Sequence, residues 1–141
     1  MPDIHHSFLV KAAPSKVFEV MTSVKGLDSW WPLTSKGEPK LNEVYTFYFG
    51  PEYDWRGQVI HVIPDKELTW KMTQCSDDWV GTEVGFILTS ENSGTRIRFF
   101  HKGWQEVSDH FEISSFCWAM LLNGMKNYVE KGIVIPHAER N

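Results

Sequence analysis

The chain has 141 residues, of which 42% are hydrophobic and 23% charged, a balance typical of a folded globular domain and not of a disordered chain. Its formal net charge of -4 and the lack of a Lys/Arg cluster argue against nucleic-acid binding, which requires a basic surface. Two cysteines outside any CxxC pattern, no signal peptide and no apolar run near the ~20 residues of a membrane span predict a cytoplasmic protein with free thiols and no membrane insertion.

The N-terminal quarter predicts one strand followed by two short helices. Residues 3–10 form the strand, and residues 13–23 form a helix with Pro14 in its first turn, where the missing N–H is not needed. A second helical piece, residues 24–31, is stopped by Pro32.

Two tryptophans stand side by side at the end of this second helix. Neighbouring side chains point about 100° apart on a helix and to opposite faces on a strand, so Trp30 and Trp31 cannot fill one site. We expect one indole to close the core and the other to rim an entrance to the interior.

The middle of the chain predicts antiparallel strands with one wet and one dry face, because apolar residues recur with a period of two. The expected strands are residues 43–50, 55–64, 67–73, 80–89 and 95–103. The fourth strand would place Val80, Thr82, Val84, Phe86 and Leu88 on one face, and the fifth would place Thr95, Ile97, Phe99 and His101 together.

The C-terminal segment changes to helical spacing. Apolar residues recur at steps of three and four over residues 109–131, which predicts a helix roughly 35 Å long. Asp109, followed by Glu112 three residues on, resembles a capping box, and Gly132 fits the position after the helix.

These elements predict an α+β fold in a single domain, residues 1–141. The sheet has a dry face to bury, and the last helix is the only long apolar one, so we expect a curved antiparallel sheet wrapped around it. The aromatic fraction of 14%, with seven Trp and nine Phe, favours either a wide core or a ligand cavity between the two.

The order of elements, together with the stretches APSKVFEVMT, SWW, GQVIHVIPDKELTWKM, GTEVGFILTSENSGTRIRFFHKGW and WAMLLNGMKNYVEKG, resembles the START-like (SRPBCC, helix-grip) superfamily. Within it, the chain is similar to the group of the C-terminal domain of the activator of Hsp90 ATPase. The resemblance covers residues 3 to 132 and implies a hydrophobic cavity between sheet and long helix. Relatives include polyketide cyclases and lipid or hormone carriers.

His101 is the sharpest polar candidate, because it shares its strand face with Ile97 and Phe99 and should point inward. A histidine there acts either as an acid–base group or ligand anchor, or as a core histidine bonded to its neighbours. The expected ligand-binding set consists of large apolar residues and this histidine: Trp30, Trp31, Tyr45, Phe47, Trp70, Phe86, Phe99, His101, Trp118 and Leu122.

No catalytic residue, metal ligand set or cofactor motif is predicted. His61 lies on a strand with two half-apolar faces, so its direction stays open. Ser108, Asp109 and His110 are contiguous at a helix start and do not form a triad, because a triad depends on spatial convergence.

Three functions remain open. The preferred one is a carrier or sensor of a small hydrophobic molecule, such as a lipid, polyketide or aromatic metabolite. The alternatives are a cyclase- or hydrolase-type enzyme that uses His101, and, from the resemblance, a module that interacts with an Hsp90-type chaperone. The exposed edge of an open sheet would also allow a homodimer.

Overall fold

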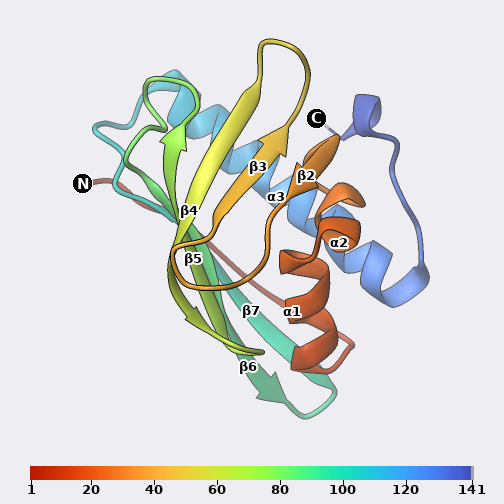
Figure 1. The fold of residues 1–141 in the computed structure, drawn as a ribbon. Helices are drawn as coiled ribbons and strands as arrows, with labels where there is room; N and C mark the ends of the chain where they lie inside the picture. The colour runs from red at the N-terminus through yellow and green to blue at the C-terminus, as the bar shows by residue number, and fades with distance from the viewer. Residues whose placement is uncertain (141) are drawn as a thin grey trace.

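A computed structural model describes residues 1–140 of the chain, and its main feature is one curved antiparallel sheet closed on one face by helices (Figure 1). The strands are β1 (Ile4–Val10), β2 (Thr34–Lys36), β3 (Val44–Tyr48), β4 (Asp54–Ile63), β5 (Glu67–Gln74), β6 (Glu83–Glu91) and β7 (Gly94–Lys102). The helices are α1 (Pro14–Thr22), α2 (Val24–Asp28), α3 (Asp109–Lys131) and the short 3-10 turn η1 (His137–Glu139).

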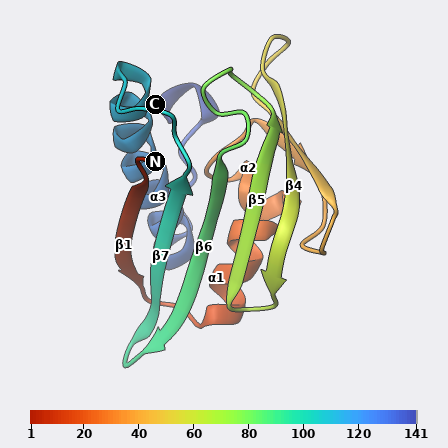
Figure 2. The same ribbon diagram turned by 90° about the vertical axis from the view of Figure 1, so that its left-hand side faces the viewer.

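The sheet order is β1-β7-β6-β5-β4-β3-β2, with every neighbouring pair antiparallel. Figure 2 shows the outer face of this sheet, with the helices behind it. The expected α+β helix-grip fold is therefore confirmed.

The curvature has local causes in β4. Its pairing with β5 shifts register between Arg56 and Gly57 and again between Val59 and His61, and such irregularities bend and twist a strand. A Cβ at Gly57 would lie 3.1 Å from the Met72 sulfur and 3.2 Å from the Phe47 ring. The glycine therefore lets the bent sheet keep its side chains packed on the concave face.

Helix α3 crosses the concave face and has the predicted bounds. Ser108, not Asp109, is the N-cap residue: its hydroxyl accepts a hydrogen bond from the Phe111 N–H at 3.2 Å. The Asp109 prediction was wrong because the serine one residue earlier has the extended backbone of a cap. Gly132 ends the helix with φ of 70°, as expected for this position.

Two further expectations need correction. Val80 is 51% exposed and precedes β6, which begins at Glu83, because Gly81 takes a positive φ of 84° and turns the chain. Helix α2 ends at Asp28, before the tryptophan pair, because the Ser29 N–H bonds to Gly26 O at 3.0 Å and tightens the last turn.

Candidate functional site

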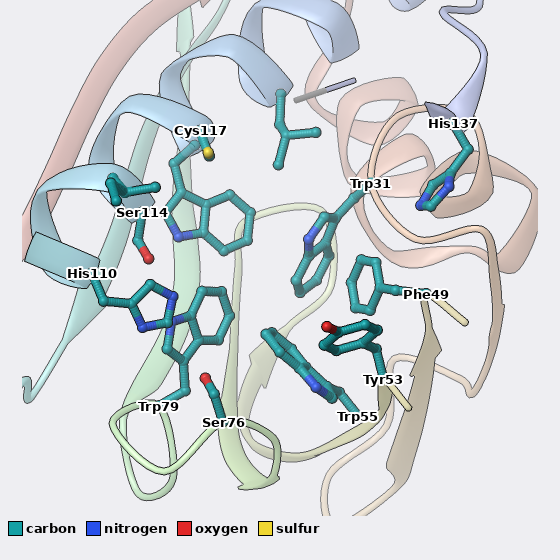
Figure 3. Close-up of a pocket in the computed structure, with 13 residues that line it drawn as sticks. Trp31, Phe49, Tyr53, Trp55, Ser76, Trp79, His110, Ser114, Cys117 and His137 are labelled. Atoms are coloured by element: carbon teal, nitrogen blue, oxygen red, sulfur yellow. The ribbon is translucent and has the colours of Figure 1, made fainter. Parts of the chain in front are cut away.

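Between the concave side of the sheet and α3 lies a cavity of about 550 Å³ that is partly open to solvent, and its volume is within the range of small-molecule sites (Figure 3). Four parts of the chain surround it: the segment just after α2, the β3–β4 hairpin, the β5–β6 connection and the first half of α3, with the C-terminal tail at one side. Its lining residues are Trp31, Phe49, Tyr53, Trp55, Ser76, Trp79, His110, Ile113, Ser114, Cys117, Trp118, Leu121 and His137. No Lys, Arg, Asp or Glu is among them.

The walls are aromatic rings that pack against one another. The Trp31 ring centre lies 4.9 Å from that of Trp118 and 5.9 Å from that of Phe49. On the other side, the Trp79 ring centre lies 4.8 Å from that of Trp55 and 5.9 Å from that of Trp118. Because these indoles pack against one another, the apolar wall is already formed in the absence of a ligand.

The two adjacent tryptophans have separate uses. Trp30 is 4% exposed, and its indole N–H donates to Val20 O of α1 at 3.2 Å, so it seals α2 against α1. Trp31 is 5% exposed and forms part of the cavity wall. The expectation that one indole rims an entrance was wrong. Both indoles are buried and their rings stack, with centres 6.1 Å apart and planes at 26°, so Trp31 packs on the sealed Trp30 and presents its other side to the cavity.

His101 is a core histidine bonded on both sides. The Trp118 indole N–H donates to His101 Nδ1 at 3.1 Å, so the remaining ring proton lies on Nε2, which donates to Thr82 Oγ1 at 2.8 Å. The Thr82 hydroxyl in turn donates to Trp79 O at 2.6 Å. Burial, followed by repulsion from His110, lowers the pKa of His101 to about 3, so the ring stays neutral. It supports two wall residues, Trp79 and Trp118, and does not itself line the cavity.

His110 forms the polar end of the cavity. Its Nδ1 donates to the Asp78 carboxylate at 2.5 Å, a contact that joins the start of α3 to the β5–β6 connection. The ring also stacks on Trp79, with centres 6.3 Å apart and planes at 25°. The hydroxyl oxygens of Ser114 and Ser76 lie at the same end, as Figure 3 shows.

The C-terminal tail covers one side of the cavity. Arg140 is only 8% exposed, and its guanidinium donates to Ile135 O, Pro32 O and Asp28 O at 2.9, 3.0 and 2.9 Å. Burial lowers the pKa of Arg140, with Asp28 opposing the shift. The bonds attach the tail beside the end of α2 and keep His137 on the cavity wall, 6.3 Å from the Phe49 ring centre.

Two of the ten residues expected to bind a ligand, Trp31 and Trp118, line this cavity. The other eight are buried in the core and do not belong to the lining: Trp30, Tyr45, Phe47, Trp70, Phe86, Phe99, His101 and Leu122. Tyr45, for example, donates its hydroxyl to Thr22 O at 2.7 Å. His61 is exposed and paired with Glu67 at 3.1 Å, outside the cavity.

The lining residues that the sequence reasoning missed lie in connections, at the start of β4, on one flank of α3 and in the C-terminal tail. Phe49, Tyr53 and Trp55 belong to the β3–β4 hairpin, and Ser76 and Trp79 to the β5–β6 connection. A period of two identifies only strand faces. The density of aromatic and polar residues in FGPEYDW and CSDDW was the available signal.

Both cysteines are free, and Cys117 lines the cavity. Burial, with a contribution from Asp78, raises the pKa of Cys75 to about 11, so that thiol stays protonated. Within residues 1–140, no group of three His, Cys, Asp or Glu side chains could hold a metal ion.

Comparison with known proteins decides the family. The model of the Activator of Hsp90 ATPase homolog 1-like proteins matches residues 11–130, most of the chain. The chain belongs to this family. No curated protein matches it.

Solved structures extend the likeness of this AHSA1-like chain. The Aha1 dimer from Colwellia psychrerythraea is 29% identical, with a TM-score of 0.85 over 94% of this chain and 98% of that one. The protein SSP2350 from Staphylococcus saprophyticus is 16% identical, with a TM-score of 0.79 over 96% of each chain. DynU16, from the dynemicin biosynthetic locus, is 19% identical, with a TM-score of 0.77 over 92% of this chain and 48% of its own. The last two likenesses show the fold alone.

Among the described residues, no helix is both long and apolar enough to cross a membrane.

Proposed function

We propose that this AHSA1-like protein binds a small hydrophobic molecule, preferably an aromatic one, as a carrier or sensor. The observation that carries the proposal is the 550 Å³ cavity whose wall contains Trp31, Trp55, Trp79 and Trp118 and no charged Lys, Arg, Asp or Glu side chain. Such a wall supplies apolar area and ring faces but no counter-ion for a carboxylate or phosphate.

The test fills the cavity and measures binding. Cys117→Trp places an indole in the space, whereas Glu112→Trp adds the same bulk to an exposed position of the same helix. We expect naphthalene to raise the melting temperature of the wild type and of Glu112→Trp, and to leave that of Cys117→Trp unchanged. Equal stabilisation of all three proteins would mean that the cavity is not the binding site.

A chaperone-binding module is the second candidate, favoured by the family match and by the 29% identical Aha1 structure. Its test is whether the chain stimulates the ATPase activity of a purified Hsp90-type protein. Unchanged ATP hydrolysis, with no complex detected at micromolar concentrations, would count against this function and leave the cavity proposal intact.

The enzyme alternative that relied on His101 gains no support from the geometry. Both ring nitrogens are engaged, with Trp118 and Thr82, and the ring is absent from the cavity lining. A group that exchanges protons with a substrate must lie within hydrogen-bonding reach of it.

A further inference from the structure

The cavity is asymmetric: its wall is apolar almost throughout, but one end carries polar groups. His110 lies there with its Nδ1 bonded to Asp78, and Ser114 follows it by one turn of α3. Figure 3 shows the ring of His110 and the hydroxyl oxygen of Ser114 turned toward the cavity.

The side-chain oxygens at this end have spare hydrogen-bonding capacity. The Ser76 hydroxyl is buried and has no hydrogen-bond partner within the described chain, although it belongs to a lining residue. Ser114 is 5% exposed and also faces the cavity. A buried hydroxyl is normally satisfied, so the unpartnered Ser76 oxygen at the end of an otherwise apolar cavity points to a polar group on the occupant.

Asp78 determines which hydrogen-bonding role His110 can play. A carboxylate only accepts hydrogen bonds, so the 2.5 Å contact places the proton of the neutral ring on Nδ1. Nε2 is then an acceptor. In the neutral form of the ring, this acceptor matches a donor such as a hydroxyl, and it does not match a carboxylate.

We infer that the polar end of the cavity recognises a hydroxyl group on an aromatic ligand, with His110 Nε2 accepting its hydrogen bond and Asp78 acting as the positioning residue. This inference rests on the proposed function, because it names a chemical group on the ligand of the same cavity. The ring system of the ligand packs among Trp31, Trp79 and Trp118, and its phenolic or enolic hydroxyl reaches His110.

The experiment compares two probes of nearly equal size, naphthalene and 2-naphthol, by NMR titration of the full chain at pH 8. The quantity of interest is the dissociation constant of naphthalene divided by that of 2-naphthol. This ratio isolates the contribution of the hydroxyl group to binding. We expect this ratio to be about fivefold higher in the wild type than in His110→Phe, since one hydrogen bond contributes roughly 1 kcal/mol. Phenylalanine keeps a ring against Trp79 and removes the acceptor.

Three controls make the result specific. His61→Phe removes the exposed histidine of the His61–Glu67 pair, which lies outside the cavity, and should leave the ratio unchanged. Asp78→Ala should lower the ratio toward that of His110→Phe, whereas Asp78→Asn, whose amide oxygen still accepts from Nδ1, should restore it. A purely structural role of Asp78 would instead weaken both probes equally, as naphthalene binding and the melting temperature would show.

Each outcome decides a different point. Binding of both probes with the same ratio in wild type and His110→Phe overturns the hydroxyl site and leaves the proposed function standing. Tighter binding of 2-naphthoate than of 2-naphthol to the wild type would also overturn it, because an acceptor nitrogen repels a carboxylate. Failure of both probes to bind overturns the two proposals together.

Discussion

Replacing His101 by leucine tests the buried network that supports the cavity wall. His101 is fully buried, and leucine fills most of its volume without its two nitrogens. The Trp118 indole N–H would then lose its acceptor, while the Thr82 hydroxyl would still donate to Trp79 O. An unsatisfied buried donor costs about 1–3 kcal/mol, so we expect the free energy of unfolding at pH 7.5 to fall by roughly 2 kcal/mol.

The same substitution should remove one contribution to the pH dependence of the free energy of unfolding. Burial lowers the pKa of His101 to about 3, whereas the unfolded chain keeps the ordinary value of 6.5. Between these two values the unfolded state binds more protons than the folded state. Protonation of His101 therefore has no effect on stability above pH 6.5 and increasingly destabilises the protein as the pH falls toward 3. At ~1.4 kcal/mol per unit, the wild type loses about 2 kcal/mol from this group by pH 5.0.

Urea unfolding, followed by tryptophan fluorescence at pH 7.5 and 5.0, measures both effects. The wild type should be more stable than His101→Leu at pH 7.5, and the two should be nearly equal at pH 5.0. His5→Leu, at an exposed position of β1, should follow the wild type at both values. If wild type and His101→Leu lose the same stability between the two pH values, the neutral buried histidine is refuted.

Three further predictions concern the frame around the cavity. Arg140→Ala should release the C-terminal tail, because the buried guanidinium donates to carbonyls of Asp28 and Pro32. Amide hydrogen exchange in residues 133–140 should speed up at least tenfold, and unchanged exchange would contradict this. Ser108→Ala should lower the free energy of unfolding, measured in urea, by about 1 kcal/mol, because it removes the N-cap of α3. Asp109→Ala should cost less, and the reverse order would be evidence for Asp109 as the cap. Gly85→Ala would place a Cβ 2.5 Å from Leu68 O, and it should cost about 2 kcal/mol or more in the same assay; a neutral result would show that β5 and β6 are less tightly packed.

The fold was predictable because its long elements carry regular patterns. Leu68, Trp70 and Met72 alternate along β5 and are all buried, and the α3 bounds followed from apolar steps of three and four. Strand β2, with the sequence TSK, was missed because three residues contain no alternation. The 3-10 turn at His137–Glu139 was missed as well, because its order depends on Arg140 bonding to distant carbonyls.

The site was predictable only in part, because much of its wall comes from connections and from the ends of strands. Alternation identified inward-facing residues such as Phe47 and Phe86, but these fill the core where sheet and helices touch. The cavity lies where they separate, and there Trp55, at the very start of β4, and the turn residue Trp79 supply the wall. His110 and Asp78 are 32 residues apart, and no spacing rule joins a helix start to a loop at that distance.

The central claim is that the space between sheet and α3 holds an aromatic guest, and the indole N–H signals of the seven tryptophans test it most directly. Titration with 2-naphthol, followed by NMR with assigned indole resonances, should shift the signals of the cavity-lining Trp31, Trp55, Trp79 and Trp118 by the largest amounts. The signals of Trp30 and Trp70, which lie in the core, should move little. Absence of shifts at saturating probe, or the largest shifts at Trp30 and Trp70, would contradict the account.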